Sequence, residues 1–136
     1  MNDWQRCRPY IEAAVYRTAQ TVCKDIQSGQ TEQTLFTIED IEHGISEKRM
    51  QFWPGRHSAG ITQVEEHGSR VDVHLLFAGG RLGELLAMAA SLEVWARVIG
   101  ADRVVFHGRR GWQRVMAKRG YRLTGDDEMA LEGNHG

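Results

Sequence analysis

The sequence predicts a single domain of the α/β (α+β) class, with a mixed, mostly antiparallel sheet and about four helices. Two apolar patterns of helical period come first, three short β-type segments follow, and the second half alternates strands and helices around glycines. With 136 residues, 41% hydrophobic and 26% charged, the chain can bury one core. We expect one domain over residues 1–136, with an N-terminal helix in 1–30, the core in 50–123 and a C-terminal strand or tail in 124–136.

Two helices are predicted before residue 50. Pro9 is expected to open the first, because the missing N–H of proline costs little in a first turn, and Gly29 is expected to end it. Thr37 is expected to cap the second, which carries acidic residues in its first turn and ends near Lys48 or Arg49. The residues expected to face inward are Ile11, Val15, Ala19, Val22 and Ile26 in the first helix and Ile38, Ile41 and Ile45 in the second.

Three short β-segments are predicted next, at Met50–Trp53, Ala59–Glu65 and Arg70–Phe77. Turn residues at 54–55 and 67–69 separate them, which is typical of an antiparallel meander. The third segment alternates apolar and polar residues along much of its length, as a half-buried strand does.

The segment Ala78–Gly83 is expected to end the third strand and to lead into the clearest helix of the sequence, which Gly100 ends. A strand at Arg103–His107 follows, then a helix from Trp112 to about residue 119, and extended segments at 121–123 and 129–131. The apolar stripe of the long helix consists of Leu85, Met88, Ala89, Leu92, Trp95, Ala96 and Ile99.

This order of elements resembles the GNAT (acyl-CoA N-acyltransferase) fold. In that family a central strand splays from its neighbour, and a loop of pattern Arg/Gln-x-x-Gly-x-Gly/Ala leads into a helix whose N-terminus holds the pyrophosphate of acetyl-CoA. Gly83 matches the last glycine, whereas Ala78 and Arg81 depart from the pattern. On the residues alone, the glycines fit a tight strand-to-helix turn equally well. The resemblance implies acetyl-CoA bound by Phe77, Ala78, Gly79, Gly80, Arg81, Leu82, Gly83 and Glu84.

A second similarity lies at residues 115–121, which resemble the family's helix ending Leu-Tyr-Glu-Lys-Leu-Gly-Phe. The tyrosine that commonly acts there as general acid is replaced by Met116, whose thioether cannot return a proton to the CoA thiolate. The family's asparagine near the end of the preceding strand is also absent between Val104 and Trp112. Segments 51–55, 78–80, 92–96 and 108–112 further resemble small tailed-phage proteins of this fold, which are often encoded among virion morphogenesis genes.

Three residues are candidate catalytic groups: Glu65, His74 and Tyr121. In active relatives a carboxylate on the strands near Glu65 often activates a water, although a solvated carboxylate is the ordinary alternative. His74 and His107 lie on strands expected to be neighbours, where either fits a general base or an ordinary strand histidine. Tyr121 fits a proton donor to the thiolate but lies one position late in the helix pattern. No two histidines have metal-ligand spacing, so no metal site is expected.

Basic residues dominate the stretch between Asp102 and Asp126, which contains no acid. Arg110, Arg114 and Lys118 recur at four-residue spacing and share one helix face. We expect either a solvated face or a site for CoA phosphates, nucleic acid or an acidic partner protein. The candidate partner-binding residues are Trp53, Arg109, Arg110, Trp112, Arg114 and Lys118.

Three functions remain open on the sequence. The first is a phage-type GNAT-fold protein with a degenerate acyl-CoA site that acts by protein binding or virion assembly. The second is an active N-acetyltransferase that transfers acetyl from acetyl-CoA to an amine, and the third is an inhibitor of a host factor. No apolar run reaches the roughly 20 residues of a membrane span, so we expect no membrane partner. We expect a cytoplasmic protein, which under the first function is also a component of the virion. The substrate amine, the partner chain and the oligomeric state stay open.

Overall fold

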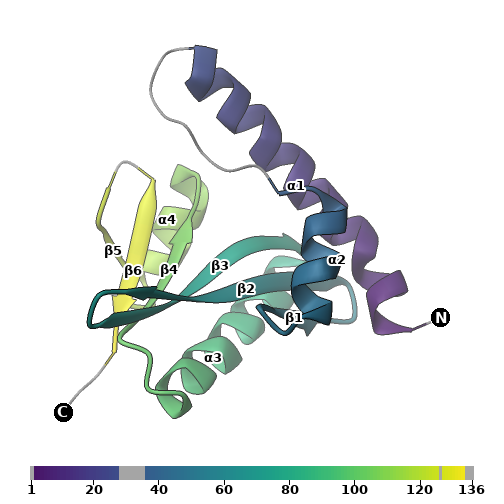
Figure 1. Cartoon of the computed structure of the whole chain (residues 1–136). Helices are drawn as coiled ribbons and strands as arrows, with labels where there is room; N and C mark the ends of the chain where they lie inside the picture. Colours follow the sequence, from purple (N-terminus) through teal and green to yellow (C-terminus); the bar gives the residue numbers. More distant parts are fainter. Residues whose placement is uncertain (1, 28–35, 126, 134–136) are drawn as a thin grey trace.

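The computed structural model describes residues 2–27, 36–125 and 127–133, with side chains described only up to residue 17 in the first range. Within these ranges the chain forms four helices and six strands (Figure 1). The helices are α1 (Asp3–Gln27), α2 (Ile38–Ser46), α3 (Leu82–Val98) and α4 (Arg110–Ala117). The strands are β1 (Met50–Pro54), β2 (Ser58–His67), β3 (Arg70–Gly80), β4 (Arg103–His107), β5 (Arg122–Leu123) and β6 (Glu128–Glu132).

One sheet joins the strands in the order β1-β2-β3-β4-β6-β5. Only β3 and β4 run parallel, and every other neighbouring pair is antiparallel. The predicted class, an α/β domain with a mixed, mostly antiparallel sheet, is therefore confirmed.

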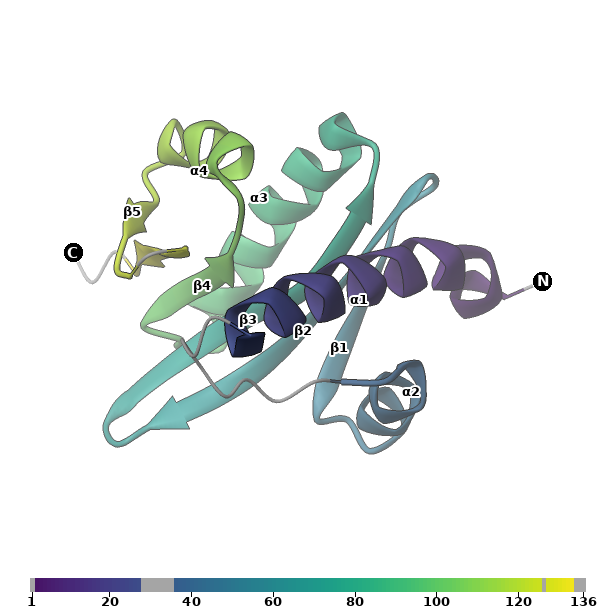
Figure 2. The same cartoon turned by 90° about the horizontal axis from the view of Figure 1, so that it is seen from above.

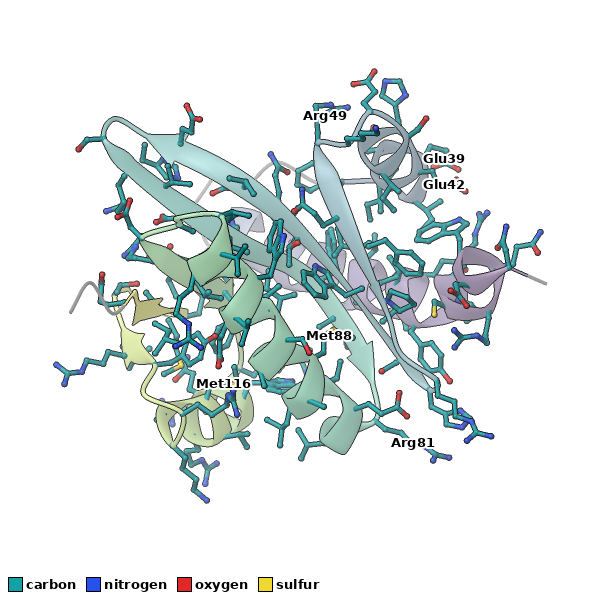
Figure 3. All side chains as sticks on the ribbon, turned by 90° about the horizontal axis from the view of Figure 1, so that it is seen from below. Glu39, Glu42, Arg49, Arg81, Met88 and Met116 are labelled. Carbon is teal, nitrogen blue, oxygen red and sulfur yellow. The ribbon has the colours of Figure 1, made fainter. Side chains whose placement is uncertain are left out.

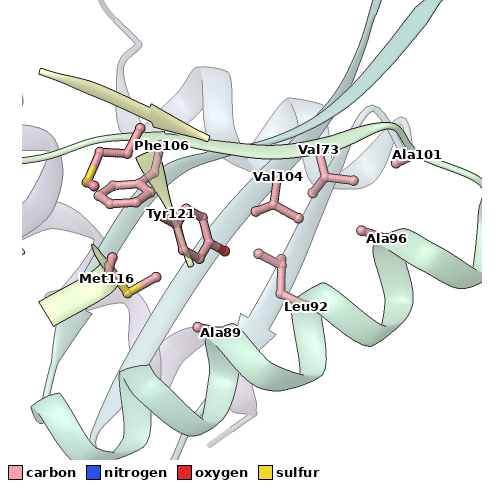
Figure 4. Packing of buried hydrophobic residues seen from close by; sticks show 10 residues of the cluster. Val73, Ala89, Leu92, Ala96, Ala101, Val104, Phe106, Met116 and Tyr121 are labelled. Atoms are coloured by element: carbon pink, nitrogen blue, oxygen red, sulfur yellow. The ribbon is translucent and has the colours of Figure 1, made fainter. Parts of the chain in front are cut away.

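Helices cover both faces of this sheet (Figures 1 and 2). α1 and α2 lie on one face, where their apolar residues pack with those of β1, β2 and β3. α3 lies on the other face and packs on β3, β4 and β6. Figure 4 shows this second cluster, in which Leu92 of α3 lies close to Val104 of β4 and Tyr121. Helices on both faces thus give the sheet one cluster of buried residues on each side.

The first helix departs from its prediction at its start. α1 begins at Asp3, so Pro9 lies inside the helix and does not open it. Proline removes one backbone hydrogen bond within a helix, but the packing of one helix face can outweigh that loss. Here Cys7 and Ile11 on either side of Pro9 are fully buried against the sheet. The predicted end at Gly29 lies outside the described residues.

The second helix confirms its predicted cap. The Thr37 hydroxyl accepts a hydrogen bond from the Asp40 backbone N–H at 3.1 Å, and the Asp40 carboxylate accepts one from the Thr37 N–H at 2.9 Å. Such a capping box satisfies two of the N–H groups that a helix start leaves without partners. Ile41 is fully buried, as expected, and the helix ends at Ser46, slightly before the predicted end.

β3 continues three residues beyond its predicted end at Phe77, because Gly79 and Gly80 pair with Ala59 and Ser58 of β2. Both glycines allow close backbone packing. A Cβ on Gly79 would lie 2.8 Å from the Tyr10 carbonyl oxygen of α1, and Gly80 has a φ of 121° and lies against the backbone of residues 57–58. Glycine within a strand often marks such an approach. The expected six-residue loop is therefore a single residue, Arg81, between strand and helix.

The predicted buried face of α3 is confirmed in the middle of the helix, but the prediction is wrong at its C-terminal end. Its fully buried residues are Leu85, Ala89, Leu92 and Ala96. Trp95, predicted to be core, is only half-buried, and Ile99 is 42% exposed because it follows the last helical residue.

A bulge in β3 shapes the region between β3 and β4. Thr62 and Ile61 of β2 pair with Leu75 and Phe77, so Leu76 is an extra residue that bends β3. The parallel pairing of β3 with β4 ends at Leu75 and Phe106. Beyond that point β3 continues beside β2 alone, over roughly 17 Å at the usual strand rise. The two parallel strands therefore separate, as Figure 2 shows.

Candidate functional site

A cleft of about 440 Å³ opens where β3 and β4 separate. Its walls are mainly apolar side chains of β3, β4, α3 and α4, and Ala14 and Arg17 of α1 border it. Figure 3 shows Met88 of α3 and Met116 of α4, two of the wall residues. An apolar pocket with a few polar groups is typical of a ligand site. The side chains that supply charge or polarity to the lining are those of Arg17, His107, Arg109 and Asp127.

The predicted cofactor-binding residues follow one edge of this cleft. Phe77 and Ala78 line it, and residues 79–84 continue from that edge into the first turn of α3. Arg81 occupies the N-cap position, and no side chain caps the helix. The N–H groups of a helix start are electropositive and attract anions. Two of the eight predicted residues thus line the cleft, and the other six form the chain that continues from it into an uncapped helix N-terminus.

The one acidic residue in the first turn of α3, Glu84, does not cap the helix. Its carboxylate accepts hydrogen bonds from the His57 backbone N–H at 2.8 Å and from the Ser58 hydroxyl at 2.7 Å. These two bonds, the first more than the second, hold the pKa of Glu84 below its usual value. Glu84 thus ties α3 to the connection between β1 and β2, and leaves the helix start open.

The three glycines of this segment have different roles. Gly79 and Gly80 have no room for a side chain, because the backbones of neighbouring segments lie against them. Gly83 has a negative φ, and a Cβ there would meet nothing within 4 Å. Glycine in a helix generally lowers stability relative to alanine, and here the packing gives no reason for it. A ligand that approaches the backbone at the start of α3 would supply such a reason.

Two arginines border the cleft, and Arg81 extends outward from the start of α3 (Figure 3). Arg17 donates a 3.5 Å hydrogen bond to the Ala78 carbonyl of β3. Arg109, exposed at the start of α4, has no ion-pair partner among the described residues. Together these guanidinium groups add positive charge to the cleft and to the start of α3.

The basic stretch after residue 102 does not act as one surface. Arg103 pairs with Asp72 at 2.9 Å, and Arg119 pairs with Glu93 at 2.6 Å, so both have structural roles. Arg110, Arg114 and Lys118 are exposed on α4 and, within the described residues, form no ion pair. With the exposed Arg109, these residues are the basic members of the predicted partner-binding set.

The two tryptophans proposed for partner binding lie in different surroundings. Trp53 is half-buried: its ring packs edge-on against Trp95 with centroids 5.6 Å apart, and its Nε1–H donates to the Thr62 hydroxyl at 2.9 Å. The ring belongs to the packing beneath α3, and the partner-binding role of Trp53 stays a prediction. Trp112 is half-buried and lines the cleft.

Tyr121 lies in the core, outside the cleft lining. Its side chain packs edge-on against Phe106, and its hydroxyl donates to Glu93 at 2.9 Å. Burial first, and the neighbouring Glu93 charge second, raise the pKa of Tyr121 well above its usual value. A phenol held in this way is a structural group, so we do not assign it the role of proton donor. Met116, by contrast, does line the cleft.

Glu65, His74 and His107 come together on the sheet face opposite α3. His74 Nδ1 lies 3.0 Å from the Glu65 carboxylate, and the His74 and His107 rings have centroids 5.2 Å apart. Sequence reasoning missed Asp127, whose carboxylate lies 3.1 Å from His107 Nδ1. The acidic residues before the last strand were the available signal, but the antiparallel pairing of β6 with β4 was needed to place them.

Two kinds of site are absent from the described parts of the chain. No group of three or more histidine, cysteine or carboxylate side chains there is arranged to hold a metal ion. No helix among these residues combines the length and apolar character of a membrane span.

The fold is similar to solved acetyltransferases. An acetyltransferase of the GNAT family from Listeria monocytogenes shares 11% sequence identity, with a TM-score of 0.57 over 90% of this chain and 86% of the other. A protein assigned as an N-acetyltransferase from Lactobacillus plantarum shares 19% identity, with a TM-score of 0.48 over 89% and 90% of the two chains. The AtaT toxin, solved with the C-terminus of the antitoxin AtaR and acetyl-CoA, shares 12% identity, with a TM-score of 0.48 over 72% and 77%.

No protein-family model matches the sequence, and no curated protein matches it. The Listeria structure and the sheet topology nevertheless show that the chain has the GNAT fold. A fold alone does not determine an activity, so function is argued from the cleft itself.

Proposed function

We propose that this protein binds an acyl-CoA in the cleft between β3 and β4 and transfers its acyl group to an amine. The observation that carries the proposal is the continuity of three features. An open apolar cleft, a strand edge that β4 no longer pairs beyond Leu75, and an uncapped helix N-terminus follow one another along β3 and into α3.

Each part of an acyl-CoA has a matching part of the cleft. The pyrophosphate fits the N–H groups at the start of α3, where Gly83 lets the backbone approach and Arg81 adds positive charge. The pantetheine arm, which carries two amides, fits the edge of β3 along residues 76–78. The thioester then reaches the end of the cleft near Phe106, where the two strands meet. Because the walls are apolar, a bound thioester is shielded from water.

The binding step is tested by calorimetric titration of the protein with acetyl-CoA. The wild type is expected to bind, and Gly83→Trp is expected to weaken binding at least about 100-fold, or ~2.7 kcal/mol, because the indole fills the phosphate site. Ala87→Trp, one turn further along the exposed face of α3, is the matched control and should bind as the wild type does. No binding at millimolar acetyl-CoA, or equal binding by both tryptophan variants, would contradict the proposal.

A second candidate is binding of an acyl-CoA without transfer, in a phage-type protein that acts on other chains in virion assembly or on a host factor. Met116 favours it, since this cleft residue cannot supply the proton that a departing thiolate needs. The exposed Arg110, Arg114 and Lys118 offer a cationic face for an acidic protein surface or for nucleic acid. Mass spectrometry of purified virions of the phage that encodes the chain distinguishes the two: a stoichiometric virion component favours assembly.

A further inference from the structure

Two histidine–carboxylate pairs lie side by side where β3 and β4 separate. In one, His74 Nδ1 is 3.0 Å from Glu65 Oε2, and in the other, His107 Nδ1 is 3.1 Å from Asp127 Oδ1. The two imidazole rings have centroids 5.2 Å apart and planes inclined by 43°. Four separate parts of the chain supply these groups: β2, β3, β4 and the residue before β6.

Only the second pair lines the cleft. His107 directly follows Phe106, the last residue of β4 that pairs with β3, so it lies at the narrow end of the cleft. Asp127 borders the cleft beside it. The His74 side chain is only 17% exposed and lies behind the His107 ring, outside the lining.

We propose that His107 is the catalytic residue that carries a proton between the acceptor amine and the CoA thiolate, and that Asp127 is its positioning residue. This inference rests on the proposed function. An Nδ1–H donated to Asp127 leaves the Nε2 lone pair available. The nearest carboxylate to Nε2, that of Glu128, is 3.9 Å away, which is too long for a hydrogen bond.

In the proposed reaction, His107 is the one protein group that accepts and returns a proton. An ammonium acceptor first gives one proton to His107 Nε2, and its neutral nitrogen then attacks the thioester carbonyl carbon. The new C–N bond forms, and the C–S bond breaks as the tetrahedral intermediate collapses. The amide nitrogen loses its second proton to solvent, and the thiolate takes the proton held on His107. One ammonium and one acyl-CoA thus become one amide, one CoA thiol and one proton.

The surroundings of His107 favour an acceptor that carries positive charge. Around its ring lie Asp127 from the residue before β6, Glu128 from β6, and the ring of His74 from β3, which itself contacts Glu65 of β2. Arg109, which lines the cleft two residues after His107, adds one positive charge beside these three carboxylates, so the local charge stays negative. An ammonium is therefore attracted to the end of the cleft where its proton is removed.

The catalytic role is tested by the release of CoA thiol from acetyl-CoA with spermidine, lysine amide and glycinamide as probe acceptors. His107→Gln is expected to lower kcat about 100-fold or more with little change in acetyl-CoA affinity, and Asp127→Asn to lower it about 10-fold or more. His43→Gln is the matched control, because His43 pairs with Glu47 on the surface of α2. Equal rates in wild type and His107→Gln, or no release with any acceptor, would overturn the proposal.

The positioning role has a readout that does not depend on turnover. Nitrogen-15 NMR of the histidine rings in the acetyl-CoA complex should show His107 with its proton on Nδ1, and Asp127→Asn should shift this tautomer toward Nε2–H. A wild-type His107 with its proton on Nε2 would contradict the proposal. Unchanged calorimetric binding of acetyl-CoA in these variants separates a failure of the proton role from a failure of the proposed function.

Discussion

Replacement of Gly80 by alanine is expected to lower the free energy of unfolding by more than about 3 kcal/mol. The residue has a φ of 121°, where side chains with a Cβ are strained by roughly 1–3 kcal/mol. A Cβ there would also overlap the backbone of His57 and Ser58, which are fixed by pairing with β3. Urea unfolding followed by circular dichroism measures the change.

The control is Gly83→Ala in the same segment. Because its Cβ would meet nothing within 4 Å, this change should raise stability by up to about 1 kcal/mol while it weakens acetyl-CoA binding. Opposite signs in two glycines three residues apart would show that one serves the fold and the other the ligand. If Gly80→Ala unfolds at the same urea concentration as the wild type, the close approach of β3 to residues 57–58 is contradicted.

Replacement of Asp72 by alanine is expected to cost about 3–5 kcal/mol, because it leaves a mostly buried guanidinium without its partner. Asp72 is 2% exposed and accepts two hydrogen bonds from Arg103, at 3.2 and 2.9 Å. Asp3→Ala breaks the surface pair with Arg6 and is the matched control, with an expected loss below about 1 kcal/mol. Equal losses in the two variants at pH 7 would contradict a buried role for Asp72.

The same carboxylate predicts acid sensitivity. Burial alone would raise the pKa of Asp72, but hydrogen bonds and charge from Arg103, with smaller effects of Arg70 and His67, hold it below its ordinary value of 3.8. A lowered folded-state pKa stabilises the fold fully above the unfolded-state pKa, and that stability is lost as the pH falls through the folded-state value. Asp72→Ala should therefore lose less stability relative to wild type at pH 3 than at pH 7.

Much of the fold was predictable because local chemistry and tertiary packing agree in most elements. The capping box at Thr37 and the central stripe of α3 each express one physical preference that the structure keeps. The predicted half-buried alternation of β3 is wrong, because helices cover both faces of the sheet and Asp72 and Val73 are both buried. Pro9 is a second exception: its local preference for a helix start is overruled by the burial of Cys7 and Ile11. A single sequence does not reveal whether the local preference of a residue or the packing of its neighbours contributes more to the stability of the helix.

The candidate site was predictable only in part, since one residue type can serve several purposes. Gly79 and Gly80 have the pattern of a loop, yet they are strand residues that admit the backbones of α1 and β2. The phenol of Tyr121 is a group that can donate a proton, yet its hydroxyl is hydrogen-bonded to Glu93 in the core. Asp127 had no visible partner until β6 was placed beside β4. Such distinctions depend on contacts between residues far apart in the sequence.

The central claim, that the start of α3 binds the phosphates of an acyl-CoA, is tested most directly by amide NMR shifts during an acetyl-CoA titration. The backbone N–H signals of Leu82, Gly83 and Glu84 should move the most and move together, because hydrogen bonds to phosphate act on these protons. Signals of α2, on the far side of the sheet from α3, should stay in place. Saturable shifts elsewhere, with these three amides unmoved, would contradict the account.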